Sequence, residues 1–187
     1  MKKYTITALV LTLIAGVCAA LIAAMNILTS PIIKKNNAEK KARLCREVAV
    51  TYDDTNEKTQ VITDGFSSSN LKELILAYDS EGNFVGYIYT AKGSNAYGEI
   101  ELLIGITDDY KLSGVRFITN GQSFSSEAAT HLNTQYKPEM GQTDVDNLDL
   151  TKSDVTAGAT YASKLIRSLV KSAFDDASSR TLDGEVS

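Results

Sequence analysis

The chain has 187 residues, of which 43% are hydrophobic and 22% charged, with a formal net charge of −4. This balance is typical of a globular protein and excludes an intrinsically disordered chain. A pI of about 5.1 argues against a nucleic-acid-binding protein, which would carry a basic stripe. The two cysteines, Cys18 and Cys45, lie far apart in the sequence and predict neither a disulfide framework nor a metal site.

The first predicted element is a membrane-spanning helix at the N-terminus. Residues 4–28 are almost all apolar or small, and none is charged. A helix of this length can cross the roughly 30 Å of hydrocarbon in a bilayer. The apolar core of a cleaved signal peptide is shorter, at about 7–15 residues, and is followed by a small-residue cleavage site. Because the segment runs on through residues 26–31 without such a site, we predict an uncleaved anchor over residues 1–31.

Two features of the anchor bear on its partners and its orientation. Small residues recur every four positions along one helix face, at Thr12, Gly16, Ala20 and Ala24. This spacing lets a second helix approach closely and predicts a docking face for membrane subunits, although small residues are also common in membrane helices. Lysine and arginine flank both ends of the segment, and a long domain can be translocated despite nearby charge. The charges therefore leave the orientation open.

An α+β domain is predicted after a basic helical stalk over residues 32–46. Within residues 47–187, apolar residues alternate with polar ones or lie between turn residues, which is typical of strands. An antiparallel sheet is predicted from strands at 74–78, 84–89, 100–106 and 112–119, with one more short strand in the loop at 53–70. A short helix is predicted over 126–136. A terminal helix packed on the sheet is predicted from apolar residues at helical spacing, Leu165, Ile166, Leu169, Val170, Ala173 and Phe174.

Two polar features are interpreted as structural. The acidic stretch at 143–154 lacks the glycine and the closing glutamate of a calcium-binding loop, so a solvated loop is predicted there. His131 is the single histidine and cannot form a metal site alone. We interpret it as a surface or helix-capping residue.

The segment that leads into the terminal helix has the chemistry of an anion site. From Asp154 to Ser163 it reads DVTAGATYAS. Its small residues let the backbone approach a ligand closely, and the first helical turn presents free N–H groups at the positive end of the helix dipole. A phosphate is favoured at such a place, and Thr160 adds a hydroxyl. A threonine near a helix start is also a common cap, so a simple helix cap is the alternative.

This segment resembles the flavinylation motif of the FMN-binding domain family, Asp-x-x-(Ser/Thr)-Gly-Ala-Thr. Asp154, Gly158, Ala159 and Thr160 match the motif, while Ala157 occupies the usual Ser/Thr position. The resemblance implies that a flavin transferase bonds FMN through its phosphate to Thr160. It also implies that the cofactor is bound by the other residues of the segment, Asp154, Ala157, Gly158, Ala159 and Tyr161.

The resemblance covers most of the chain. Residues 97–106, YGEIELLIGI, and 111–115 resemble two strands of the family. Residues 29–32 follow the membrane helix much as in the G subunit of Rnf-type ion-translocating oxidoreductases. Tyr97 is implied to contact the flavin ring. Ser123 is implied to do so from the 120–127 loop, where the family has a Glu-Thr-Pro-Gly-like turn that this chain lacks.

The resemblance implies an electron-transfer subunit rather than an enzyme with its own catalytic residues. Electrons would pass between reduced ferredoxin and NAD through several membrane subunits, coupled to Na⁺ or H⁺ movement. The soluble domain would lie outside the cytoplasm, held to the plasma membrane by one helix. Three alternatives are a stand-alone extracytoplasmic flavoprotein, a component like the C subunit of sodium-pumping NADH:quinone oxidoreductase, and an anchored binding or structural module.

Overall fold

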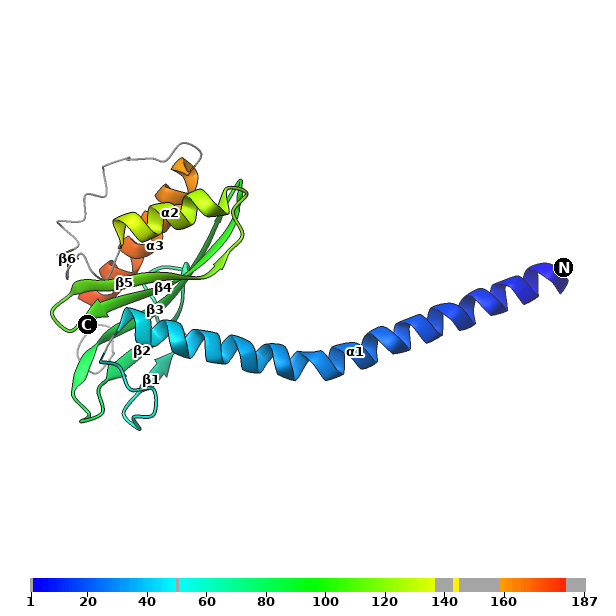
Figure 1. Ribbon diagram of the computed structural model, residues 1–187, viewed down its shortest axis with the longest axis horizontal. Helices are drawn as coiled ribbons and strands as arrows, with labels where there is room; N and C mark the ends of the chain where they lie inside the picture. Colours follow the sequence, from blue (N-terminus) through cyan, green and yellow to red (C-terminus); the bar gives the residue numbers. More distant parts are fainter. Residues whose placement is uncertain (1, 50, 137–142, 145–158, 181–187) are drawn as a thin grey trace. The chain divides into compact units, whose positions relative to one another are not determined.

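The computed structural model describes residues 2–49, 51–136, 143–144 and 159–180. An N-terminal helix is followed by an antiparallel sheet and two further helices (Figure 1), which confirms the predicted α+β class. The chain divides into two compact units, Met1–Lys41 and Ala42–Ser187. In chain order the elements are α1 (Lys2–Val48), β1 (Gln60–Ile62), β2 (Leu71–Tyr78), β3 (Phe84–Asn95), β4 (Gly98–Thr107), β5 (Lys111–Asn120), α2 (Ser125–Gln135), β6 (Thr143–Asp144) and α3 (Thr160–Ser178).

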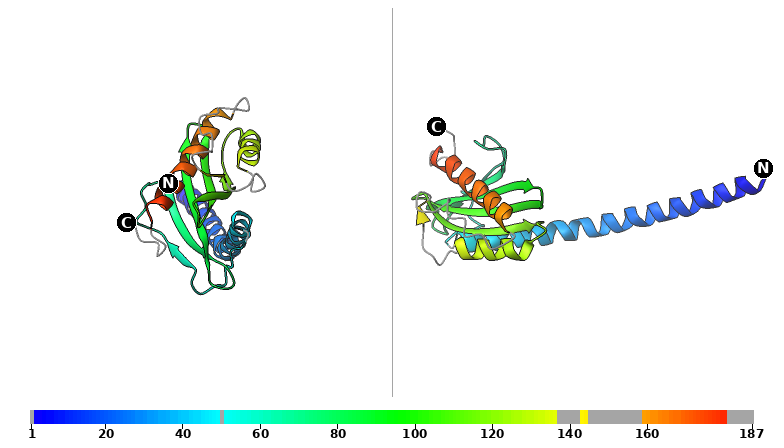
Figure 2. Two further views of the ribbon diagram at one scale, coloured as in Figure 1. Left: turned by 90° about the vertical axis from the view of Figure 1, so that its left-hand side faces the viewer. Right: turned by 90° about the horizontal axis from the view of Figure 1, so that it is seen from above.

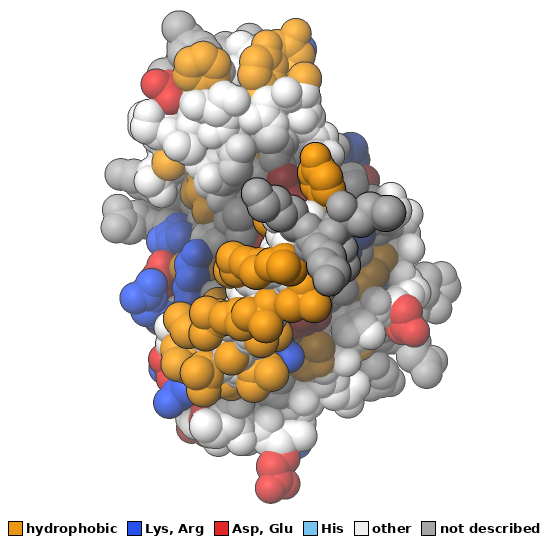
Figure 3. All heavy atoms as spheres, turned by 90° about the vertical axis from the view of Figure 1, so that its right-hand side faces the viewer, with side chains coloured by type: hydrophobic (Ala, Val, Ile, Leu, Met, Phe, Trp, Pro, Cys, Tyr) orange, Lys and Arg blue, Asp and Glu red, His pale blue; other side chains and the backbone are white. Residues whose placement is uncertain are grey.

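Helix α1 is unbroken from Lys2 to Val48 and contains Pro31. It is long and apolar enough to cross a membrane, and none of its most apolar stretch is buried against the rest of the protein. Its large apolar side chains between Tyr4 and Ile33 are exposed, and a patch of hydrophobic side chains lies near the centre of the view in Figure 3, with smaller groups elsewhere. The boundaries predicted at residues 31 and 46 both fall inside this helix. The division into anchor, stalk and domain at those positions stays a prediction.

The six strands are neighbours in the sheet in the order in which they occur in the sequence, β1 to β6. Every neighbouring pair is antiparallel, so the sheet is a simple meander. The four predicted main strands are confirmed as β2 to β5, and the short strand expected in 53–70 is β1. The loop predicted at 143–154 instead begins with a strand, because residues 143–144 pair with the start of β5. Residues 145–154 lie outside the described part.

Both faces of the sheet are buried, which explains the continuous apolar run in β2. Leu74 and Leu76 face α3, while Ile75 and Ala77 face the end of α1. Successive side chains of a strand point to opposite faces, so a strand that is covered on both sides has no polar face. Helix α3 lies along the sheet over β3 and β4 (Figure 2).

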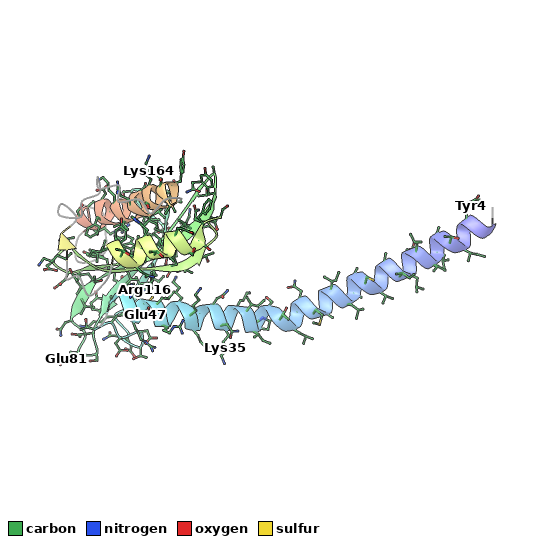
Figure 4. The ribbon with its side chains drawn as sticks, turned by 45° about the horizontal axis from the view of Figure 1, so that its top comes forward. Tyr4, Lys35, Glu47, Glu81, Arg116 and Lys164 are labelled. Carbon is green, nitrogen blue, oxygen red and sulfur yellow. The ribbon has the colours of Figure 1, made fainter. Side chains whose placement is uncertain are left out.

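The last turns of α1 belong to the domain and cover the second face. Leu44, Cys45 and Val48 are buried there. The Arg116 guanidinium on β5 pairs with Glu47, with 3.1 Å between Nε and Oε2 (Figure 4). The sequence does not single out this packing, although the spacing of the three apolar residues fits one helix face.

A buried ion pair fixes the C-terminal end of α3. The Asp176 carboxylate accepts hydrogen bonds from Arg180 Nε at 2.6 Å and from the Tyr89 hydroxyl at 2.9 Å. It also accepts the N–H of Ser67 at 2.7 Å, and Arg180 donates to the Gly65 carbonyl at 3.0 Å. Burial alone would raise the pKa of Asp176, but these donors outweigh burial and lower it. The network ties α3 to β3 and to the loop before β2.

Candidate functional site

Thr160 is the first residue of α3. The N-cap position belongs to Ala159, which is fully buried, and no side chain in the described part of the chain makes a capping hydrogen bond there. The first turn is closed by Ser163, whose N–H and hydroxyl both donate to the Ala159 carbonyl, at 2.7 and 2.8 Å. Thr160 is half-buried, and it follows the N-cap position instead of occupying it. Thr160 thus belongs to the first turn, whose N–H groups have no partner within the helix.

Two tyrosines meet beside the start of α3. The Tyr97 ring in the β3–β4 turn and the Tyr161 ring have centroids 5.2 Å apart, with their planes at 42°. Both side chains are exposed, at 41% for Tyr97 and 56% for Tyr161. Two neighbouring aromatic rings that are exposed offer a surface on which a flat ring can pack.

The loop after β5 closes against the same turn. Ser123 donates its N–H and its hydroxyl to the Tyr97 carbonyl, at 2.9 and 3.2 Å. The Gln122 side chain donates to the Gly98 carbonyl at 2.7 Å. Gly98 has φ +138°, and a Cβ added there would lie 2.1 Å from the Gly121 carbonyl oxygen. Only glycine allows this approach, which places Ser123 next to Tyr97.

The structure therefore gathers five of the eight residues predicted to bind the cofactor. Ser123 contacts Tyr97, Tyr97 contacts Tyr161, and Tyr161 follows Ala159 and Thr160 in the chain. The other three, Asp154, Ala157 and Gly158, lie outside the described residues, and their roles stay predictions.

Sequence reasoning did not single out Asn95, at the end of β3, which contacts Tyr97. Its Oδ1 accepts the N–H of Tyr97 at 2.8 Å. Its Nδ2 is buried and has no hydrogen-bond partner among the described residues. The motif does not predict this donor, because Asn95 lies in another part of the chain.

The residues present fit an FMN group. A hydroxyl at the positive end of a helix suits a phosphate ester. The tyrosine pair suits a flat ring, and the Asn95 Nδ2, which has no acceptor among the residues that the structure describes, suits an accepting oxygen. The hydroxyl, the aromatic faces and the donor come from separate elements.

The interpretation of His131 as a surface residue is wrong. Its side chain is buried, only 5% exposed, and its ring packs edge-on against Tyr136, with centroids 6.1 Å apart. Burial and the nearby Arg167 charge lower the pKa of His131. The α2 sequence places it on the same face as Ala128 and Leu132, which are core residues. His131 follows Ala128 by three positions and precedes Leu132 by one, and this helical spacing was the sequence signal for its burial.

Comparison with known proteins agrees with the resemblance. A sequence profile of the RnfG N-terminal region matches residues 1–48. The N-terminal region is therefore similar to that of RnfG proteins. The chain is 27% identical over 184 residues to a protein of Methanosarcina acetivorans that is named as the G subunit of an ion-translocating oxidoreductase complex. That alignment covers 93% of this chain and 94% of the relative, so the likeness to this relative extends through both the apolar helix and the domain with Thr160.

Proposed function

We propose that this chain is the G-type subunit of a membrane-bound ion-translocating oxidoreductase and carries FMN esterified through its phosphate to Thr160. It would serve as an electron relay between reduced ferredoxin and NAD. The observation that carries the proposal is the position of Thr160, which begins a helix without capping it and adjoins an exposed tyrosine pair. The end-to-end similarity to the archaeal relative supports the same assignment.

Each residue of the site has a separate task in this proposal. Thr160 is the tether: its hydroxyl oxygen bonds to phosphorus, its proton leaves, and the nucleotide part of an activated flavin donor departs with the electrons of the broken bond. The first turn of α3 stabilises the phosphate charge. Tyr97 and Tyr161 pack against the ring, and Ser123 holds Tyr97 in place. Bound FMN supplies the redox chemistry, accepting and donating electrons.

Membrane attachment follows from α1. One helix of this length and composition suits a single-pass protein of the plasma membrane. We propose that the domain lies outside the cytoplasm, so that electrons reach it through membrane subunits of the same complex. The small-residue face of α1, with Gly16 and Ala20, would pack against those subunits.

Two alternatives keep the flavin but change its setting. A stand-alone extracytoplasmic flavoprotein, or a component like the C subunit of sodium-pumping NADH:quinone oxidoreductase, would use the same Thr160 ester. Purification of the intact complex from native membranes distinguishes them, because the proposed subunit must co-purify with ferredoxin:NAD oxidoreductase activity.

Intact mass measurement tests the attachment site. The full chain, produced with a flavin transferase, should gain the mass of FMN minus water, since ester formation replaces the hydroxyl hydrogen of Thr160. Thr160→Ala should abolish the gain and the yellow fluorescent band on a denaturing gel. Thr134→Ala removes an exposed threonine of α2 and should keep it. Equal flavin addition to Thr160→Ala would refute the site.

A further inference from the structure

The β3–β4 turn holds a buried donor whose direction is fixed. Asn95 Oδ1 accepts the Tyr97 N–H at 2.8 Å, so turning the amide over would break that bond. Its Nδ2 atom is thereby aimed away from Tyr97 N, is buried, and has no acceptor among the described residues. A buried donor without an acceptor destabilises a fold. A ligand with an accepting oxygen would remove that penalty.

Strand geometry puts this donor under the start of α3. A Cβ added at Gly93 would touch Leu165 at 2.8 Å, so Gly93 faces α3. Side chains two residues apart share a face, which places Asn95 on the α3 side, one step nearer the turn. Two residues further on, Tyr97 meets Tyr161 at the first turn of the helix. Asn95 therefore lies on the face of the sheet that carries the proposed FMN site.

The other buried polar atoms without partners in the described chain differ in kind. They are the hydroxyls of Thr59, Tyr87 and Thr90. A hydroxyl can rotate and can act as donor or acceptor, so several orientations can satisfy its hydrogen bonding. The Asn95 Nδ2 only donates, and its amide cannot turn without losing the Tyr97 bond.

We propose that the Asn95 side-chain amide donates a hydrogen bond to an oxygen of the FMN carried by Thr160. Asn95 is then a cofactor-binding residue from outside the flavinylation motif. This inference rests on the proposed function. FMN has two kinds of acceptor, the phosphate oxygens and the ring carbonyl oxygens. The ³¹P chemical shift and the midpoint potential of the flavin distinguish them.

Two substitutions distinguish the role of the Asn95 Nδ2 donor from the role of Asn95 in the β3–β4 turn. Asn95→Asp keeps an oxygen for the Tyr97 N–H but removes the Nδ2 donor. Asn95→Ala removes both without adding charge. Asn133→Asp, at an exposed position of α2, makes the same change of charge elsewhere and serves as the control. All are made in the full flavinylated chain in detergent.

The readouts are the ³¹P chemical shift of the phosphoester and the midpoint potential of the flavin. A ring acceptor predicts that both Asn95 variants lower the potential, because a donor binds the electron-rich reduced ring more tightly. A tenfold change in relative stabilisation corresponds to about 30 mV for a two-electron couple. A phosphate acceptor predicts a changed ³¹P shift with an unchanged potential. Values in both variants equal to those of Asn133→Asp would overturn the inference.

Failure of attachment is also decisive. If Asn95→Asp takes up little flavin while the melting temperature of its flavin-free form matches that of the native chain, the contact with FMN is supported. If that melting temperature falls, Asn95 serves the fold and the inference is wrong. Absence of flavin from the native sequence itself would instead refute the proposed function.

Discussion

Removing the charge of Asp176 should cost the domain a large part of its stability. Asp176 and Arg180 are both buried, with 0% and 5% of their surface exposed. In Asp176→Asn, an oxygen can still accept the Ser67 N–H, but an amide NH₂ then faces Arg180 Nε and the Tyr89 hydroxyl. The guanidinium is left buried without a counter-charge. Breaking a buried ion pair in this way costs about 3–5 kcal/mol, compared with about 5–15 kcal/mol for a whole domain.

A neighbouring pair on the same helix provides the control. Lys171 and Asp175 form an ion pair with the same i, i+4 spacing at 2.9 Å, but both side chains are more than half exposed. Asp175→Asn should therefore cost only about 0.3–0.5 kcal/mol. Urea unfolding of the full chain in detergent, followed by near-ultraviolet circular dichroism of its tyrosines, measures both. A cost for Asp176→Asn as small as that for Asp175→Asn would refute the structural reasoning.

The same pair predicts part of the acid response. The pKa of Asp176 is lowered in the folded chain, so its charge stabilises the fold above the unfolded value of about 3.9. That contribution is lost as the pH falls through the lower folded pKa. Asp176→Asn should therefore have a flatter stability curve below about pH 4 than the native chain, measured by the same unfolding experiment.

Two further predictions concern α2 and α3. Because burial lowers the pKa of His131, its neutral form is favoured in the fold. The free energy of unfolding should therefore fall as the pH drops below about 6.5, by about 1.4 kcal/mol per unit of pKa lowering. His131→Gln should flatten the dependence of the melting temperature on pH between about 7.5 and 5.5, and an unchanged slope would contradict this. Gly93→Val places a side chain against Leu165, where even a Cβ would lie at 2.8 Å. It should lower the free energy of unfolding in urea by about 1–3 kcal/mol. Adding Leu165→Ala should recover part of that loss, whereas strictly additive costs would show that the two residues do not touch.

The sheet was predictable because its signals are local. Alternating apolar residues and the Asp79–Asn83 turn mark β2 and β3, and the structure extends β2 by three residues and β3 by six. The run of α1 through Pro31 was not predicted. A proline removes one helical hydrogen bond, but the helix-forming residues on both sides continue the helix. The burial of Cys45 was missed because the surface that covers it is distant in sequence.

Part of the candidate site could likewise be predicted from neighbouring residues, whereas the rest depends on contacts between distant parts of the chain. Consecutive residues predicted an anion site at the helix start, with a helix cap as the alternative, and the family resemblance then singled out Thr160 as the flavin acceptor. Tyr97 and Ser123 could be proposed only through resemblance to a family. Their actual meeting depends on Gly98, where a φ of +138° lets the chain at Gly121 approach. No pattern in the sequence announces that contact.

The two ends of α3 have different roles, and the helix connects them rigidly. From Thr160 to Asp176 the helix spans about 24 Å, with its middle packed on β3 and β4. The buried Asp176–Arg180 pair fixes the far end against Tyr89, while Tyr161 at the near end contacts Tyr97 in the β3–β4 turn. Tyr89 lies within β3 and Tyr97 lies in the turn that follows that strand, so one strand and its turn contact both ends of the helix. A tethered redox group needs such a frame, because a covalent bond alone fixes where a flavin is attached and leaves its ring free to move.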